Sequence, residues 1–135
     1  MESETVTLTV LDYERPSVGS FYNDNWLLCE VLVRAGAFFG KFQANFLTSE
    51  IEDLWQGLST LHRTLRGEYT FAPLEGQLVL RASCDHLGHI HLSGEAVDHV
   101  GTGHRLIFAF AFDQTYLVKS LHELSDVVHA FPVRA

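Results

Sequence analysis

The chain is poor in several residue types, and each shortage excludes a class of protein. Its 135 residues include only two cysteines and three prolines. Cys29 and Cys84 are isolated in apolar segments and do not form the disulfide framework of a small secreted domain, so we expect free thiols in a reducing compartment. The amino end, Met1 to Glu4, lacks the basic start of a signal peptide. No apolar run reaches the length of a membrane span, and we therefore expect a cytoplasmic protein.

Basic residues are also few. Nine Lys and Arg residues stand against 17 Asp and Glu residues, which gives a formal net charge of −8. Such a balance argues against nucleic acid or an anionic membrane as partner, because both repel an acidic surface. A basic protein or cationic ligand would be attracted, although many soluble proteins are acidic for solubility alone. The composition, 47% hydrophobic and 19% charged, indicates a globular protein, and we expect one domain over residues 1–135.

Motifs of catalysis and cofactor binding are missing. No Gly-x-Ser-x-Gly sequence occurs, and neither cysteine stands in the setting of a nucleophile. The odd spacing of Glu95 and Asp98 sends them to opposite faces of a strand, so they are not a carboxylate pair. Gly101-x-Gly103 is not followed by a helix start and does not form a phosphate-binding loop. We therefore predict no catalytic residues, no cofactor and a protein that is not an enzyme.

The stretch from Leu106 to Phe131 has the clearest structural pattern. Seven consecutive apolar residues, Leu106 to Phe112, are typical of a strand covered on both faces, so we expect this strand to be central in a sheet. Asp113 follows and is suited to cap a helix, because its carboxylate can accept from unpaired amides of the first turn. The stripe that predicts this amphipathic helix consists of Leu117, Leu121, Leu124, Val128 and Phe131.

A second helix is expected between residues 49 and 67. Ser49 followed by Glu52 matches the capping box, and Gly67 is suited to end the helix. Its stripe consists of Ile51, Leu54, Leu58, Leu61 and Leu65. Strands are predicted at 5–11, 26–33, 37–46, 68–72, 77–83, 89–100 and 105–112. The predicted fold class is α+β, with a mostly antiparallel sheet of about seven strands and two amphipathic helices packed on it.

An internal relation links the two halves of the chain. Displacing the sequence by 66 residues aligns Phe46 with Phe112 and Ile51 with Leu117. A duplicated strand-strand-helix unit explains this alignment. So does the general tendency of any two amphipathic helices to align on their stripes, and both explanations stay open.

Histidines form the strongest candidate for a chemical site. His89 and His91 lie two residues apart on one strand face, as zinc ligands often do, and His99 or His104 could supply a third nitrogen. The intervening Ile90 belongs to the apolar face, however, so the pair also fits an ordinary solvated face. A metal- or small-ligand-binding domain built on these histidines is one alternative for the function.

Acidic and aromatic residues indicate a surface for a protein partner. Carboxylates gather at the start of the first long helix, where they also complement the helix dipole. A tryptophan beside the helix stripe is suited to be an interface anchor or to close the edge of the core. The residues that we predict to contact a partner are Asp24, Trp26, Glu50, Glu52, Asp53 and Trp55.

Three short motifs resemble those of the WapI-type immunity proteins. They are Asn25-Trp26-Leu27, Gly88-His89-Ile90 and the segment from Phe112 to Leu117, and the resemblance spans roughly residues 26 to 131. It implies a short chain, found beside a polymorphic toxin, that binds and silences that toxin without catalysis. A basic toxin surface would be steered to an acidic chain.

A third interpretation of the function is a domain that associates with itself through sheet edges.

Overall fold

The structure is a computed structural model that describes residues 4–134. The sequence of the amino end predicts no signal peptide, and three of its residues, Met1 to Ser3, lie outside the described residues. The first half of the chain forms β1 (Glu4–Tyr13), α1 (Phe21–Asp24), β2 (Trp26–Ala35), β3 (Phe38–Leu47) and α2 (Thr48–Thr64). The second half forms β4 (Glu68–Phe71), β5 (Leu78–Cys84), β6 (His89–Val97), β7 (Arg105–Asp113) and α3 (Thr115–Ala130).

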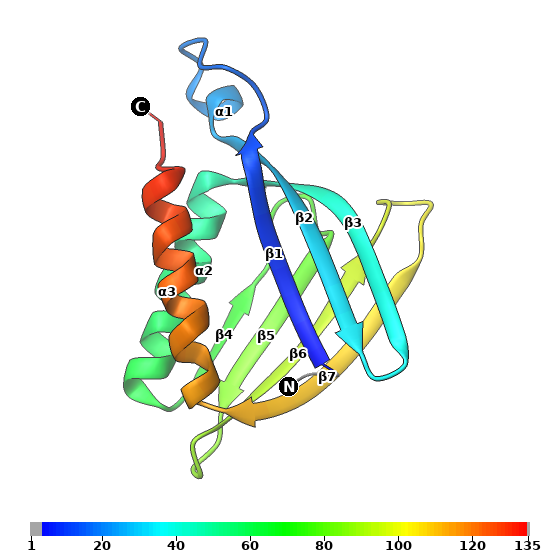
Figure 1. Ribbon diagram of the computed structural model, residues 1–135, viewed down its shortest axis with the longest axis vertical. Coiled ribbons are helices and arrows are strands. Elements are labelled where there is room, and N and C mark those ends of the chain that lie inside the picture. Colours follow the sequence, from blue (N-terminus) through cyan, green and yellow to red (C-terminus); the bar gives the residue numbers. More distant parts are fainter. Residues whose placement is uncertain (1–3, 135) are drawn as a thin grey trace.

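The seven strands divide into two antiparallel sheets. One has the order β1-β2-β3 and the other the order β4-β5-β6-β7, so each is a meander of chain neighbours. The prediction of an α+β fold with mostly antiparallel strands and two amphipathic helices is confirmed. In Figure 1 the strands of the two sheets cross in projection, and α2 and α3 stand together at one side of them.

The main core lies between the two sheets. Period-2 alternation turns one face of each strand inward, which is why the register Cys29–Ala44 and Leu27–Phe46 places four apolar side chains on the same face. The rings of Phe46 in β3 and Phe71 in β4 join the sheets, with centroids 5.9 Å apart. Fully burying a side chain of this size contributes roughly 1.5–3 kcal/mol. Other buried members are Val31, Val33, Leu78, Ala96 and Phe108.

The helices close one side of this sandwich with the stripes predicted from the sequence. Leu61 of α2 and Leu117 of α3 are buried in a second cluster with Ile90 of β6. Directly after the end of α3, Phe131 packs edge-on against Tyr13 of β1, with ring centroids 5.5 Å apart. The helical layer therefore contacts both sheets. No helix in residues 4–134 is long and apolar enough to cross a membrane.

The position predicted for residues 106–112 is wrong, because β7 is the outermost strand of its sheet. Leu106, Phe108 and the other even-numbered residues lie on the core side, whereas Ile107, Ala109 and Ala111 are exposed. The exposed fraction of Ile107 reaches 74%. All of these residues are apolar, so their alternation is one of size, large inward and mostly small outward. A reading of hydrophobicity alone does not detect it.

The helix ends also differ in detail from the sequence pattern. The Ser49–Glu52 capping box is wrong: α2 begins at Thr48, and the carboxylate of Glu50 accepts from the backbone N–H of Leu47 at 2.8 Å. The helix ends at Thr64, and Leu65 takes the left-handed conformation, with φ of 54°, where we expected Gly67 to end it.

The two halves share the same plan at their ends. Displaced by 66 residues, β3 and α2 fall on 104–113 and 114–130, which match β7 and α3 within one residue at each end. The first sheet has three strands and the second four. The shared plan is therefore confined to the last strand and the long helix of each half.

Candidate functional site

The histidine pair lies on either side of one carboxylate. Asp85, in the turn between β5 and β6, places Oδ2 at 2.9 Å from Nε2 of His91 and 3.6 Å from Nδ1 of His89. Its other oxygen accepts from the backbone N–H groups of Leu87 and His89. The hydrogen bond with His91 and these amides hold the pKa of Asp85 well below its ordinary value. This cluster therefore fixes the turn.

The other two histidines lie at the opposite end of β6. His99 and His104 belong to the loop after Val97, where Oδ1 of Asp98 accepts from the backbone N–H of His104 at 2.6 Å. A strand of this length separates its ends by roughly 25 Å. The structure does not bring the four histidines together, so the prediction of a third ligand from His99 or His104 is wrong. Among residues 4–134, no three His, Cys, Asp or Glu side chains are arranged to hold a metal ion.

Two of the predicted partner-binding residues lie inside the protein. Asp24 is 1% exposed, and its carboxylate accepts from the backbone N–H groups of Val18 and Gly19 and from the hydroxyl of Ser17, at 2.9–3.0 Å. The bond from Val18 is the largest cause of its lowered pKa. Trp26 is 8% exposed. Short polar side chains close loops in this way, so Asp24 shapes the segment before β2. Because Asp24 and Trp26 are both buried, neither forms part of a contact surface.

The carboxylates of α2 differ in their availability. Both oxygens of Glu50 accept from backbone N–H groups, those of Leu47 and Leu74. Asp53 accepts from the hydroxyl of Tyr69 at 2.7 Å, and burial together with this carboxylate raises the pKa of Tyr69. Glu52 makes only a 3.5 Å hydrogen bond with Gln56 among the described residues. Of the three, Glu52 makes the longest hydrogen bond, and its side chain is intermediate in exposure.

Trp55 lies where α2 meets α3. Its ring is half-buried and packs edge-on against the ring of His129, with centroids 6.2 Å apart. This contact, together with the burial of Leu61 beside Leu117, makes the two helices antiparallel neighbours. The amino-terminal half of α2 therefore lies beside the carboxyl-terminal half of α3.

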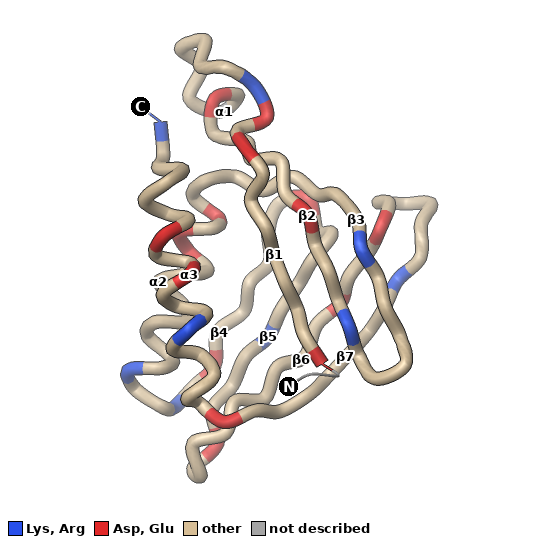
Figure 2. Tube along the Cα trace, viewed as in Figure 1, with Lys and Arg blue, Asp and Glu red and all other residues tan. Residues whose placement is uncertain are grey.

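The pairing of these helices gathers negative charge. Figure 2 shows acidic segments on both helices at the same height. The two helices carry five carboxylates against two cations, Arg63 and Lys119. We define the helical face as Glu52, Trp55, Glu123, Asp126 and His129. Glu123 and Asp126 were not predicted, because the sequence does not show that the polar side of α3 lies next to α2.

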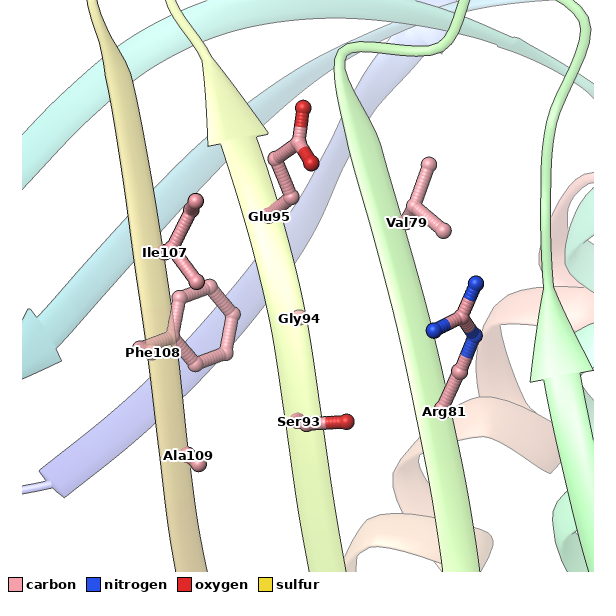
Figure 3. Close-up of a pocket in the computed structure, with 8 residues that line it drawn as sticks. All are labelled: Val79, Arg81, Ser93, Gly94, Glu95, Ile107, Phe108 and Ala109. Carbon is pink, nitrogen blue, oxygen red and sulfur yellow. The ribbon is translucent and has the colours of Figure 1, made fainter.

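The outer face of the second sheet contains a shallow hollow of about 440 Å³. Figure 3 shows its side chains, which come from β5, β6 and β7. Glu95 makes an ion pair with Arg105, whereas the guanidinium of Arg81 makes no ion pair or side-chain hydrogen bond within residues 4–134. The remaining side chains are apolar or short: Val79, Ser93, Ile107, Phe108 and Ala109.

The first family motif is a structural joint. Asn25 is 2% exposed, and its Oδ1 accepts from the hydroxyl of Thr48 at 2.9 Å and from the backbone N–H of Arg134 at 2.7 Å. Its Nδ2 donates to the backbone C=O groups of Phe21 and Arg134. One side chain thus ties together α1, the start of α2 and the carboxyl-terminal segment.

The other two motifs meet at a second joint. Gly88 has φ of 82°, and its C=O accepts from the backbone N–H of Gln114 at 3.3 Å. A Cβ at Gly88 would lie 3.1 Å from Nε2 of the Gln114 side chain. His89 and Asp113 are register partners in β6 and β7. Asp113 precedes the N-cap residue Gln114 and accepts from the N–H of Thr115, the first residue of α3, at 3.0 Å. The motifs that carry the resemblance therefore hold the fold together at two corners.

Comparison with known protein families supports the resemblance that these motifs indicate. No curated protein matches the chain. The model of the immunity protein WapI-like family matches residues 1–132, which is nearly the entire sequence. The chain therefore belongs to the immunity protein WapI-like family.

Proposed function

We propose that this protein neutralises its cognate toxin by binding a basic surface of the toxin to the helical face. Membership in an immunity protein family implies a toxin as the protein partner. The observation that carries the finer proposal is the packing of Trp55 against His129, which brings the part of α2 that carries Glu52 beside the part of α3 that carries Glu123 and Asp126. Unlike Asp24 and Glu50, these three carboxylates are not held by backbone N–H groups in the described structure.

The composition of this face matches what a protein interface needs. Carboxylates on both helices attract a basic partner and raise its association rate, and this effect falls as salt screens the charges. The half-buried Trp55 supplies apolar area that strengthens binding when the partner covers it. Trp55 is already held in place by His129, so little side-chain freedom is lost on binding.

Inhibition by this route is stoichiometric and needs no catalysis. We propose that the protein acts in the cytoplasm, which is supported by two cysteines that are both free, one of them, Cys29, buried in the core. Burial raises the pKa of the Cys29 thiol to about 12, so this thiol stays protonated and unreactive at neutral pH. Titrating the toxin with the protein should abolish toxin activity at an equimolar ratio.

The test uses the toxin encoded beside this protein, purified and assayed for binding. The double variant Glu52→Gln/Asp126→Asn removes two negative charges from the helical face. We expect about a tenfold weaker Kd, mostly through a slower association rate, and a smaller dependence on salt. Trp55→Ala should instead increase the dissociation rate.

The matched control changes the net charge by the same amount elsewhere. Thr7→Lys/Thr9→Lys adds two positive charges on exposed positions of β1, away from the helices. We expect this variant to bind the toxin nearly as well as the natural protein. Equal weakening by the two double variants would mean that only the net charge matters, and the helical face would then be rejected as the binding site.

A further inference from the structure

The strand β7 leaves one long edge unpaired. It is the last strand of its sheet and hydrogen-bonds with β6 on one side, while no described strand pairs with its other side. Figure 1 shows this strand at the rim of the molecule. Proteins usually protect such edges with a charge or a proline in the strand, and β3, another edge strand, has Lys41 near its middle. Residues 106–112 of β7 contain neither.

We propose that β7 pairs antiparallel with β7 of a second copy, centred on Ala109. Ala109 is the midpoint of the strand, and Arg105 and Asp113 lie four residues to either side of it. Two-fold pairing about the midpoint therefore brings Arg105 of each copy opposite Asp113 of the other. Opposite charges facing each other across a strand pair favour association, and here the symmetry forms the contact twice.

Side-chain sizes fit the same register. On the outer face, Ile107 of one copy lies opposite Ala111 of the other, so an exposed large side chain meets a small one. On the inner face, Phe108 lies opposite Phe110, and cross-strand aromatic pairs stabilise a sheet. Residues of one face pair only with residues of the same face, because the register is centred on a residue.

Other registers lose this match. A shift of one residue places core-facing phenylalanines opposite outward-facing alanines. A shift of two residues keeps the faces but leaves Arg105 and Asp113 without their opposite charges. In the centred register, Arg105 keeps its ion pair with Glu95 and gains a second carboxylate from the other copy.

The resulting dimer is closed and has one continuous sheet of eight strands, four from each copy. Pairing removes the free edge of β7, which accounts for an edge without protecting residues. The contact lies on a different element from the helical face, so it does not depend on the function proposed above. Each outcome of the tests below therefore bears on the dimer alone.

The first test is sedimentation equilibrium of the untagged protein between about 1 and 200 μM, a range that covers typical weak dimers. We expect a mass of about 30 kDa at the upper end, twice the 15.2 kDa of one chain. Ala109→Lys places two like charges opposite each other and should weaken the dimer about tenfold. Thr7→Lys, on another exposed edge strand, should leave it unchanged. A monomer at every concentration, or equal effects of the two lysines, would overturn the proposal.

The second test reads the register directly and does not depend on the strength of the dimer. In a Cys84→Ser background, Ala109→Cys brings two thiols opposite each other, at a separation that suits a disulfide. Ala111→Cys faces Ile107 of the other copy and has no thiol opposite it. We expect Ala109→Cys to form a covalent dimer under mild oxidation at least about tenfold faster than Ala111→Cys. Equal rates would exclude the centred register.

Discussion

The ring of Tyr69 lies against the backbone of Gly57, in the middle of α2. A Cβ at Gly57 would overlap the edge of that ring and come within 2.6 Å of its Cζ. The hydroxyl of Tyr69 donates to Asp53 one turn earlier in the helix, which holds the ring across the helix surface. Glycine inside a helix costs about 1 kcal/mol relative to alanine, and here the close approach of β4 accounts for it.

Replacing Gly57 by alanine should therefore destabilise the protein. The methyl group forces Tyr69 away from its site, and overpacking of this kind costs typically about 1–3 kcal/mol, more than the gain in helix propensity. Urea denaturation followed by circular dichroism measures the change. Gly40→Ala is the control, because no described atom lies within 4 Å of its Cβ position, and we expect equal or slightly higher stability. A Gly57→Ala variant as stable as Gly40→Ala would contradict the packing argument.

Gly94 occupies a similar position inside the second sheet. It lies between Leu80 and Phe108 in the cross-strand register, and a Cβ there would come 2.6 Å from the Phe108 ring and 2.8 Å from the Val79 carbonyl oxygen. The carbonyl belongs to the backbone and cannot move aside. We expect Gly94→Ala to lower the free energy of unfolding by at least about 2 kcal/mol. Ser93→Ala, at the exposed neighbouring position, should change it by less than about 0.5 kcal/mol.

Local patterns in the sequence predict the elements of this fold but not how they assemble. The stripe from Leu117 to Phe131 and the hydrogen bond of Asp113 with the first amide of α3 follow from local helix geometry. The division of the strands into two sheets depends on contacts between distant segments, such as that between Phe46 and Phe71. Position within a sheet is equally non-local, and for this reason the apolar run of β7 predicts a central strand although β7 lies at the edge.

Candidate site residues show the same limit. The acidic residues Asp24, Glu50 and Glu52 look alike in the sequence, yet backbone amides engage the first two and do not engage Glu52. Nothing local distinguishes them, since the amide that engages Glu50 at its second oxygen comes from Leu74 in a distant loop. Asp126 belongs to the helical face only because α3 packs beside α2. Composition predicts an acidic surface but does not locate it.

Stability should fall steeply in acid. Four aspartates have pKa values below their ordinary value of 3.8: Asp24, Asp85, Asp98 and Asp113. For Asp85 the main cause is the hydrogen bond with His91, and for the others it is a backbone N–H. Because these carboxyl groups have a lower pKa in the folded protein, the unfolded chain binds protons at a higher pH than the folded one. The stabilisation that the four carboxylates contribute is therefore present above about pH 4 and is lost as the pH falls below it.

The measurement is the free energy of unfolding between pH 7 and pH 2. Asp85→Asn keeps the size of the side chain but cannot lose a charge in acid, so the dependence on pH below about pH 4 should become shallower. Asp12→Asn is the matched control, since Asp12 is exposed and accepts only from its neighbour Tyr13 in the described structure. If Asp85→Asn and the natural protein lose stability in parallel, the hydrogen bonds of Asp85 do not shape the acid response.

Asn25→Ala should be the most damaging single change among polar residues. The buried amide of Asn25 makes four hydrogen bonds, and its loss leaves the Thr48 hydroxyl and the backbone of Arg134 without partners. A buried polar group without a partner costs about 1–3 kcal/mol, so we expect a loss of about 2–4 kcal/mol. Asn23→Ala, at an exposed position of α1 two residues before Asn25, should cost less than about 0.5 kcal/mol.

Hydrogen exchange distinguishes the loss of this joint from general destabilisation. The guanidinium of Arg134 lies over the ring of Tyr13, 3.4 Å from its centroid, and the Tyr13 hydroxyl donates to the Pro132 carbonyl. Releasing Asn25 removes the two backbone bonds that hold Arg134 against these contacts. We expect the backbone amide of Arg134 to exchange at least about tenfold faster in Asn25→Ala, while amides in the middle of β2 keep their protection. Uniform acceleration over both regions would show that Asn25 stabilises the fold as a whole and does not act as a local joint.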